Sequence, residues 1–279
     1  VANRVAPAFR LSGFPYSRDR SRRATRAPSQ RVIGQVLMNF DEQLEAILPG
    51  VGKPARYTGG EFNSVVKDHK SVDVRFALAF PDAYEIGMSN LGVRILYHIL
   101  NHRSDVAAER VFAPWVDMEA EMRRVGLSLW TLETRTPVSE FDIVGFSLGY
   151  ELSYTNVLNM LDLAGIPVLA SERTDEHPLV ISGGCCAFNP EPMTDFIDAF
   201  VIGEGEDIVH ELIDSYKEHR GKGKAALLSE LARIPGVYVP GLYRVEYNPD
   251  GTLRSVLPTE QGVPETVTKR IVADLDTSE

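Results

Sequence analysis

The residues from Val72 to Leu100 constrain the fold more than any other stretch of this chain. Val72–Phe80 is a β-branched and aromatic run typical of a buried strand, and Pro81 ends it because proline cannot donate to a sheet ladder. A polar loop follows, and a helix is then expected from Leu91, with Ser89 as its cap and its apolar residues on one stripe. Strand, loop and helix in this order open an α/β sheet, in which ligands bind at the carboxyl ends of the strands.

Apolar runs and amphipathic segments go on alternating up to about residue 220. Strands are expected at 72–80, 110–113, 127–132, 142–147, 178–182 and 198–202. This rhythm predicts an α/β fold, a doubly wound, mostly parallel, Rossmann-like sheet. Later residues suggest a short helix over 225–233, a small C-terminal β-hairpin around Asn248-Pro-Asp-Gly251, and one more strand over 267–272.

The chain is expected to have four parts. Residues 1–36 are rich in Arg and Ser, have no periodic apolar face and are predicted to be disordered. A non-native extension is the favoured explanation for them, ahead of an organelle transit peptide and an RNA-binding arm. Residues 37–71 should form a helix and a surface segment, 72–220 the main domain, and 221–279 a helix, a hairpin and a linker.

Charge and composition exclude several classes of protein. The formal net charge is −10, and residues 1–36 hold eight arginines and one acid, so the remainder is more acidic still. An acidic chain segment of this kind is a poor candidate for nucleic-acid binding, which relies on neutralising phosphates. No apolar run approaches the roughly 20 residues needed to cross a bilayer. The only two cysteines are adjacent, which rules out a disulfide framework and predicts a reducing cytoplasm.

The loops that follow the strands are the candidate binding site. The carboxyl ends of parallel strands meet at one edge of a sheet, so residues scattered through the sequence should converge there. Glycines at such points let a backbone approach a ligand closely. The predicted site residues are Asp82, Tyr84, Gly87, Ser147, Gly183, Gly184, Gly203 and Glu204.

The segment Gly203-Glu-Gly-Glu206 is not a dinucleotide fingerprint. Ile208 stands where that pattern requires a third glycine, and the acidic side chains would repel a phosphate. Two interpretations remain open. The acids either stabilise the positive end of the following helix, or they bind a hydroxyl or amide donor of a ligand.

No catalytic or metal-binding motif is recognisable. The sequence has no Gly-x-Ser-x-Gly elbow, no His-Glu-x-x-His pair and no Walker loop. Cys185-Cys186 cannot hold a cubane cluster, which needs spaced thiolates, and both cysteines are expected to be small buried residues behind the glycines. We therefore predict neither catalytic residues nor a metal site within this chain.

Several segments in fixed order resemble one family. They are Lys53-Pro-Ala-Arg-Tyr57, Phe80-Pro-Asp-Ala-Tyr-Glu-Ile-Gly-Met-Ser-Asn-Leu-Gly92, Glu109-Arg-Val-Phe-Ala-Pro-Trp115, Gly145-Phe-Ser-Leu-Gly-Tyr-Glu-Leu-Ser-Tyr-Thr-Asn156, Gly183-Gly184, Asn189-Pro-Glu-Pro192 and Gly203-Glu-Gly-Glu206. Together they resemble the N-terminal half of an uncharacterised family of radical SAM proteins with a vitamin B12-binding-type front domain. The resemblance runs from about Leu44 to the C-terminus.

This resemblance implies a Rossmann-like, corrinoid-binding front domain whose cofactor is cobalamin. In that superfamily the chemistry takes place in a following barrel, where Cys-x-x-x-Cys-x-x-Cys holds a [4Fe–4S] cluster and S-adenosylmethionine. The sequence contains no such motif, so the chain resembles the front domain alone, as a fragment or the product of a split gene. The implied partner is a radical SAM barrel, to which the domain presents cofactor or substrate. The alternative is a Rossmann-like scaffold or docking domain that binds no cofactor.

One correspondence bears on the cobalt ligand. Related corrinoid domains use Asp-x-His-x-x-Gly after the first strand, and here Asp82-Ala-Tyr84-Glu-Ile-Gly87 has tyrosine in the place of histidine. A phenol, with a pKa of about 10, is a poor neutral ligand at pH 7. The resemblance therefore implies a bound corrinoid whose cobalt has no protein nitrogen ligand.

Overall fold

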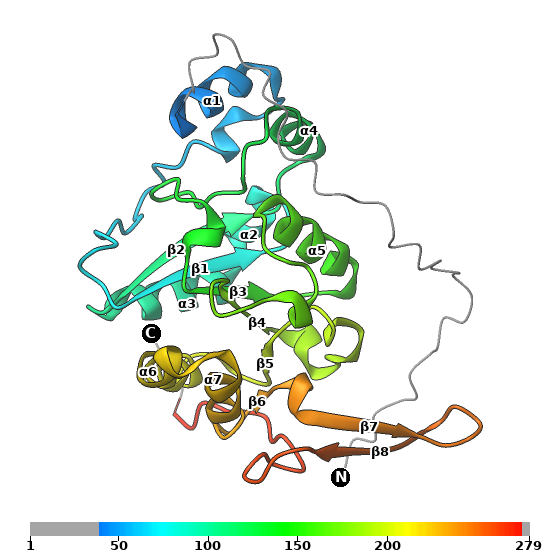
Figure 1. Cartoon of the computed structure of the whole chain (residues 1–279). Helices are drawn as coiled ribbons and strands as arrows, with labels where there is room; N and C mark the ends of the chain where they lie inside the picture. The colour runs from blue at the N-terminus through cyan, green and yellow to red at the C-terminus, as the bar shows by residue number, and fades with distance from the viewer. Residues whose placement is uncertain (1–38, 275–279) are drawn as a thin grey trace.

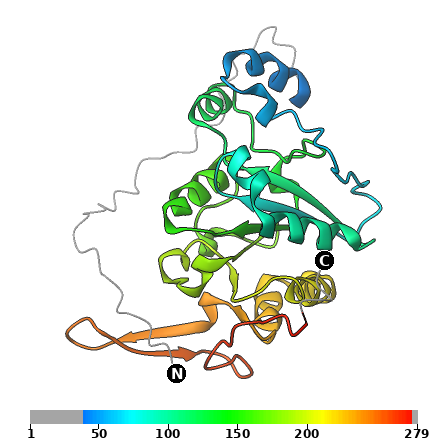
Figure 2. The same ribbon diagram turned by 180° about the vertical axis from the view of Figure 1, so that it is seen from behind.

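A computed structural model describes residues 39–274 of the chain (Figures 1 and 2). A six-stranded sheet forms the centre of the molecule, with helices on both of its faces, and a separate two-stranded sheet projects from one end. The predictions for residues 1–36 and for the last five residues lie outside the described part of the chain.

The central sheet confirms the predicted fold class. Its strand order is β2-β1-β3-β4-β5-β6, in which β1 to β5 are parallel and the edge strand β6 is antiparallel to β5. The strands are β1 Val74–Phe80, β2 Val106–Phe112, β3 Ile143–Ser147, β4 Leu179–Gly183, β5 Ala199–Val201 and β6 Val237–Tyr238. This order is that of the flavodoxin-like α/β folds, which bind ligands where the direction of winding changes, beside β1 and β3.

Alternate side chains of the strands form two hydrophobic cores, one on each face of the sheet. The helices α1, α4 and α5 contribute to one core, and α3, α6 and α7 contribute to the other. Their bounds are α1 Phe40–Ile47, α2 Tyr84–Ser89, α3 Leu91–His102, α4 Val116–Val125, α5 Tyr154–Leu163, α6 Ile208–His219 and α7 Lys224–Leu231. No helix within residues 39–274 has the length and apolar character needed to cross a membrane.

Two local predictions are wrong. Leu127–Leu132 is not a strand, because Leu129 donates its N–H to Leu163 at the end of α5 and Thr131 donates to nearby Thr136, so neither group joins a sheet ladder. The expected loop after β1 contains the short helix α2. As a result Asn90, not Ser89, caps α3, and its side chain accepts the Val93 N–H at 3.0 Å.

The residues after 220 contribute to the main sheet before they leave it. α7 packs in the same core as α6, and β6 completes the edge of the sheet. The predicted hairpin is confirmed as β7 Tyr243–Tyr247 and β8 Leu253–Pro258, and both views show it projecting from the body (Figures 1 and 2). The chain then returns as a C-terminal strap (residues 259–274), where the predicted strand over 267–272 reduces to a single bridge between Arg270 and Gly203.

The carboxylate of Asp105 ties α3 to α6. Asp105 lies just before β2 and accepts hydrogen bonds from Arg103, which follows α3, at 3.0 and 2.9 Å. It also accepts one from Lys217, in the last turn of α6, at 2.6 Å. These cations, led by Arg103, hold the pKa of Asp105 well below its usual range. The C-terminal ends of the two helices are therefore fixed side by side.

Replacing Asp105 with Asn should lower the free energy of unfolding at pH 7 by about 2 kcal/mol, the scale of hydrogen bonds to a charged group. Because the pKa of Asp105 is depressed in the folded state, its contribution is complete above the unfolded value of about 3.9 and is lost as the pH falls below it. The difference between the wild-type protein and Asp105→Asn in urea unfolding should therefore shrink below about pH 4.

The matched control is Glu121→Gln, which removes an exposed ion pair with Arg124 and should have a much smaller effect, because solvent screens such pairs. Equal losses for the two variants, or a cost for Asp105→Asn that does not change with pH, would contradict the role given to Asp105.

Candidate functional site

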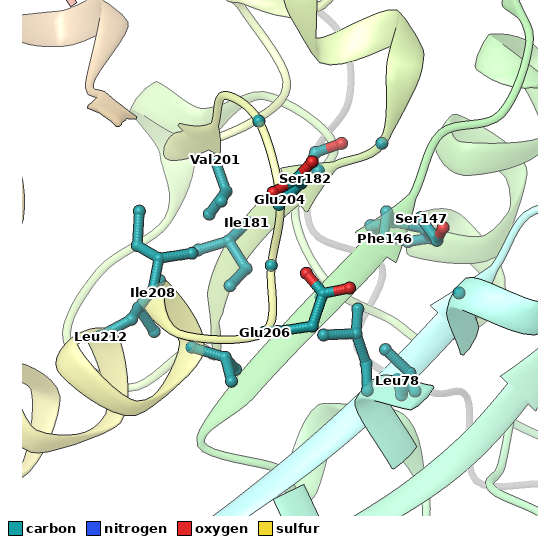
Figure 3. A pocket seen from close by; sticks show the side chains of 18 of the residues that line it. Leu78, Phe146, Ser147, Ile181, Ser182, Val201, Glu204, Glu206, Ile208 and Leu212 are labelled. Carbon is teal, nitrogen blue, oxygen red and sulfur yellow. The ribbon is translucent and has the colours of Figure 1, made fainter. Parts of the chain in front are cut away.

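A cavity of about 230 Å³ lies between α3, α6 and the sheet, at the carboxyl ends of the parallel strands (Figure 3). Its walls are mostly apolar. Phe76 and Leu78 of β1 and Ile181 of β4 form the side toward the sheet, while Leu96 of α3 and Leu212 of α6 form the opposite side. A concave, mostly apolar space at this edge is the usual kind of site for a small ligand in an open α/β sheet.

The way in which α3 and α6 are held accounts for the cavity. Their C-terminal ends are joined through Asp105, whereas the cavity residues lie in their N-terminal halves, at Gly92, Leu96, Ile208, Val209 and Leu212. The helices thus leave a gap over β3. Gly145 of β3 lets the Phe76 ring of β1 pack closely at the floor of this gap, since a Cβ there would lie 2.6 Å from that ring.

The predicted glycines of the site have different structural roles. A Cβ at Gly183 would meet nothing closer than Val201 at 3.7 Å, so this glycine leaves room that a side chain could occupy. Gly184 and Gly203 have φ values of +98° and +111°. A Cβ there would lie 2.5 Å from the Leu148 carbonyl and 2.2 Å from the Arg270 carbonyl respectively, so both glycines allow two backbone segments to touch.

Few polar side chains line the cavity. Ser147 ends β3 and, by strand alternation, lies on the same face as Gly145; its hydroxyl has no hydrogen-bond partner in residues 39–274. The Glu204 carboxylate accepts the Val272 N–H of the C-terminal strap. Figure 3 shows the Glu206 carboxylate between Ile181 and Leu78. Five of the eight predicted residues therefore meet here: Ser147, Gly183, Gly184, Gly203 and Glu204.

Asp82 does not line this cavity. Its carboxylate accepts hydrogen bonds from the Tyr150 hydroxyl and, at 2.7 Å, from the Ala83 N–H, and its carbonyl accepts the Ala113 N–H at 3.0 Å. The bond to Asp82 raises the pKa of the Tyr150 phenol. These contacts make Asp82 a brace between the loops that follow β1, β2 and β3.

Tyr84 and Gly87 lie on the β2 side of β1, also outside the cavity. The Tyr84 ring packs edge-on against Phe112, with ring centres 5.7 Å apart. Burial, and then the nearby Glu61 carboxylate, raise the pKa of the Tyr84 phenol. A Cβ on Gly87 would lie 2.1 Å from the Phe112 ring, so this glycine is needed for the packing of α2. Helix α2, which the sequence analysis missed, turns both residues toward β2.

The cysteines differ from the prediction in one respect. Cys186 is buried as expected, but Cys185 is exposed and its thiol donates to the Gly149 carbonyl at 2.8 Å. The 3₁₀ turn at Cys185–Phe188 rotates successive side chains to different sides, which places one thiol outward. Within residues 39–274 no group of three or more His, Cys, Asp or Glu side chains is arranged to hold a metal ion.

Sequence reasoning missed Gly145, Leu96 and Glu206 as cavity residues. Gly145 stands inside a strand, where a glycine often marks a close approach of a ligand or another chain segment, and this signal could have identified it. Glu206 belongs to the same short motif as Glu204. Choosing between the two required knowledge of the C-terminal strap, which pairs with the loop from more than sixty residues away.

The comparisons with known proteins define the class to which this fold and site belong. The family described as "Radical SAM proteins, N-terminal" matches residues 92–240, which is more than half of the chain, and the chain belongs to this family. The matched region includes α3, α6 and all the strands that border the cavity except β1.

One curated relative can be named. The uncharacterized protein MJ0966 of Methanocaldococcus jannaschii is 25% identical over 166 residues, which are 58% of this chain and 31% of that protein. The chain thus spans about a third of the length of the relative it matches. No solved structure matches the chain.

Alanine substitutions at Gly87 and Gly183 should distinguish a glycine that packing requires from one that borders open space. Gly87→Ala drives a methyl group into Phe112 and should cost about 1–3 kcal/mol of unfolding free energy. Gly183→Ala meets only ordinary contacts and should change it by less than about 1 kcal/mol, since alanine also restricts the unfolded chain. Urea unfolding of both variants tests this, and a larger loss for Gly183→Ala than for Gly87→Ala would contradict the packing described.

Proposed function

We propose that this domain binds a corrinoid for a radical SAM enzyme, and that the cavity between α3 and α6 takes the nucleotide tail of the corrinoid. The observation that carries the proposal is the cavity itself, an apolar slot at the carboxyl edge of a parallel sheet in a chain of the radical SAM N-terminal family. The resemblance of the sequence to B12-binding-type front domains gives the class of cofactor.

The size and chemistry of the cavity fit a planar base but not a corrin ring. At about 230 Å³ the space is smaller than the roughly 300–1,000 Å³ of sites that enclose a whole drug-sized ligand. Its walls offer apolar side chains to the faces of a ring and the free hydroxyl of Ser147 to a ring nitrogen. The bulky part of the cofactor would then remain over the open edge of the sheet.

The same residues supply no axial ligand to the cobalt. Among residues 39–274 no histidine lines the cavity, and Tyr84 is packed against Phe112 on the β2 side of β1. We therefore expect a bound cobalamin whose base is withdrawn from the cobalt and is not replaced by a protein nitrogen.

An exposed apolar rim supports a radical SAM barrel as the partner. Ile86 follows β1, Trp115 follows β2, Leu152 follows β3 and Phe188 follows β4, and between 52% and 84% of each residue is exposed. Hydrogen bonds among the loops after β1, β2, β3 and β4 hold them together at this edge. A clustered apolar surface is typical of a docking site. A barrel on this rim would bring its [4Fe–4S] cluster and S-adenosylmethionine to the bound corrinoid.

The rim also favours a second candidate function. A scaffold that binds no cofactor and only docks a barrel or another protein would need the rim but not the cavity. The two candidates therefore differ in whether a corrinoid enters the cavity.

Titration of the protein with cobalamin should change the visible spectrum with saturation. In the reduced, paramagnetic cobalt state, the electron paramagnetic resonance spectrum should have no nitrogen hyperfine splitting, because the base lies in the cavity. Splitting from a protein nitrogen would contradict the absence of an axial ligand. The lack of any spectral change would favour the scaffold.

Filling the cavity gives an independent check. Gly183→Leu should weaken cobalamin binding at least tenfold, since the added side chain extends from a position without close neighbours. The control is Gly221→Leu, at an exposed glycine that also has no neighbours and does not line the cavity. Unchanged affinity in a folded Gly183→Leu protein would show that the cavity does not hold the tail.

A further inference from the structure

The loop Gly203–Glu206 (the acidic loop) passes through a narrow space between the C-terminal strap and α3. A Cβ at Gly203 would collide with the Arg270 carbonyl of the strap, at 2.2 Å. A Cβ at Gly205 would lie 3.1 Å from the Leu96 side chain of α3. The two glycines therefore fix which way the loop turns, and with it the directions of the two glutamates between and after them.

Glu204 and Glu206 of the acidic loop differ in their hydrogen-bond partners. The Glu204 carboxylate holds the strap by accepting the Val272 N–H, next to the backbone pairing of Glu204 with Arg270. The Glu206 side chain lies at the cavity and is partly buried (Figure 3). It forms no hydrogen bond or ion pair with any residue in the described part of the chain. A partly buried carboxylate without a partner, at the edge of an otherwise apolar space, has its acceptor oxygens available to a ligand.

We propose that Glu206 selects the ligand by accepting a hydrogen bond from a ribose hydroxyl, so that the cavity takes an uncharged nucleoside group and rejects one that carries a phosphate at its mouth. The proposal rests on the proposed function, because the tail of cobalamin is a base joined to a ribose. It assigns to Glu206 the recognition of the sugar, while the apolar walls and Ser147 receive the base.

Hydrogen bonding by the Glu206 carboxylate and its repulsion of a phosphate both favour the nucleoside over the nucleoside phosphate. An ionised carboxylate only accepts hydrogen bonds, and bonds to a charged group are stronger than neutral ones. The same charge repels a nearby phosphate in a partly desolvated space. Glu206 stands two residues before Ile208, where α6 begins. The phosphate of cobalamin itself, on the corrin side of the ribose, would lie in solvent, where screening weakens the repulsion.

The test compares three small probes by isothermal titration calorimetry. They are 5,6-dimethylbenzimidazole, its ribonucleoside and the 5′-phosphate of that nucleoside. The wild-type protein should bind the nucleoside more tightly than either the base or the phosphate. Glu206→Gln should lower the preference for nucleoside over phosphate by roughly tenfold, since the amide removes the charge and weakens the bond. Glu121→Gln, on α4 at the other face of the sheet and away from the cavity, is the control and should leave this preference unchanged.

Three outcomes would overturn the inference. The preference for the nucleoside could be unchanged in Glu206→Gln, it could fall equally in Glu121→Gln, or the wild-type protein could bind none of the probes. The corrinoid proposal is judged separately by cobalamin titration of the same wild-type sample. Binding of cobalamin without any preference among the probes would leave that proposal standing and remove the role of Glu206. Thermal unfolding of each variant establishes that it is folded.

Discussion

The right-handedness of β-strand crossovers determines where this molecule can bind anything. β1 lies between β2 and β3, so the chain moves in one direction along the sheet to reach β2 and then in the other to reach β3. With right-handed crossovers, this reversal places α3 on one face and α4 and α5 on the other. The face with α3 is covered again only when α6 returns after β5, and the space over β3 stays open between the two helices.

The remaining features of the site follow from that open space. Asp105 joins the C-terminal ends of α3 and α6 at the opposite edge of the sheet, away from the gap. The acidic loop enters α6 at the mouth of the gap, and the C-terminal strap holds this loop through Arg270 and Glu204. The C-terminal strap is thus in direct contact with the acidic loop at the cavity.

The sequence was sufficient for the parts of this structure that depend on local pattern. The buried runs around Val74–Phe80 and Ile143–Ser147 and the Asp-Gly hairpin signal predicted the sheet and the hairpin, because strand composition and turn chemistry are local. Convergence of the loops was predicted for Ser147, Gly183, Gly184, Gly203 and Glu204, which share one edge. The prediction was wrong in placing Asp82, Tyr84 and Gly87 with them. Helix α2 turns Tyr84 and Gly87 toward Phe112, and Asp82 is hydrogen-bonded to Tyr150. The role of Glu204 depends on residues 270–272, and no local pattern could reveal that contact.

If the gap between α3 and α6 receives the base of a corrinoid, as proposed, protons of the ligand will lie close to methyl groups of the protein. In a methyl-labelled sample with bound cobalamin, nuclear Overhauser effects should connect the aromatic protons of the base to the methyl groups of Leu96, Ile181 and Leu212. These three residues come from two helices and a strand and meet only around the cavity. Effects confined to residues of the exposed rim, with none to these methyl groups, would contradict the account.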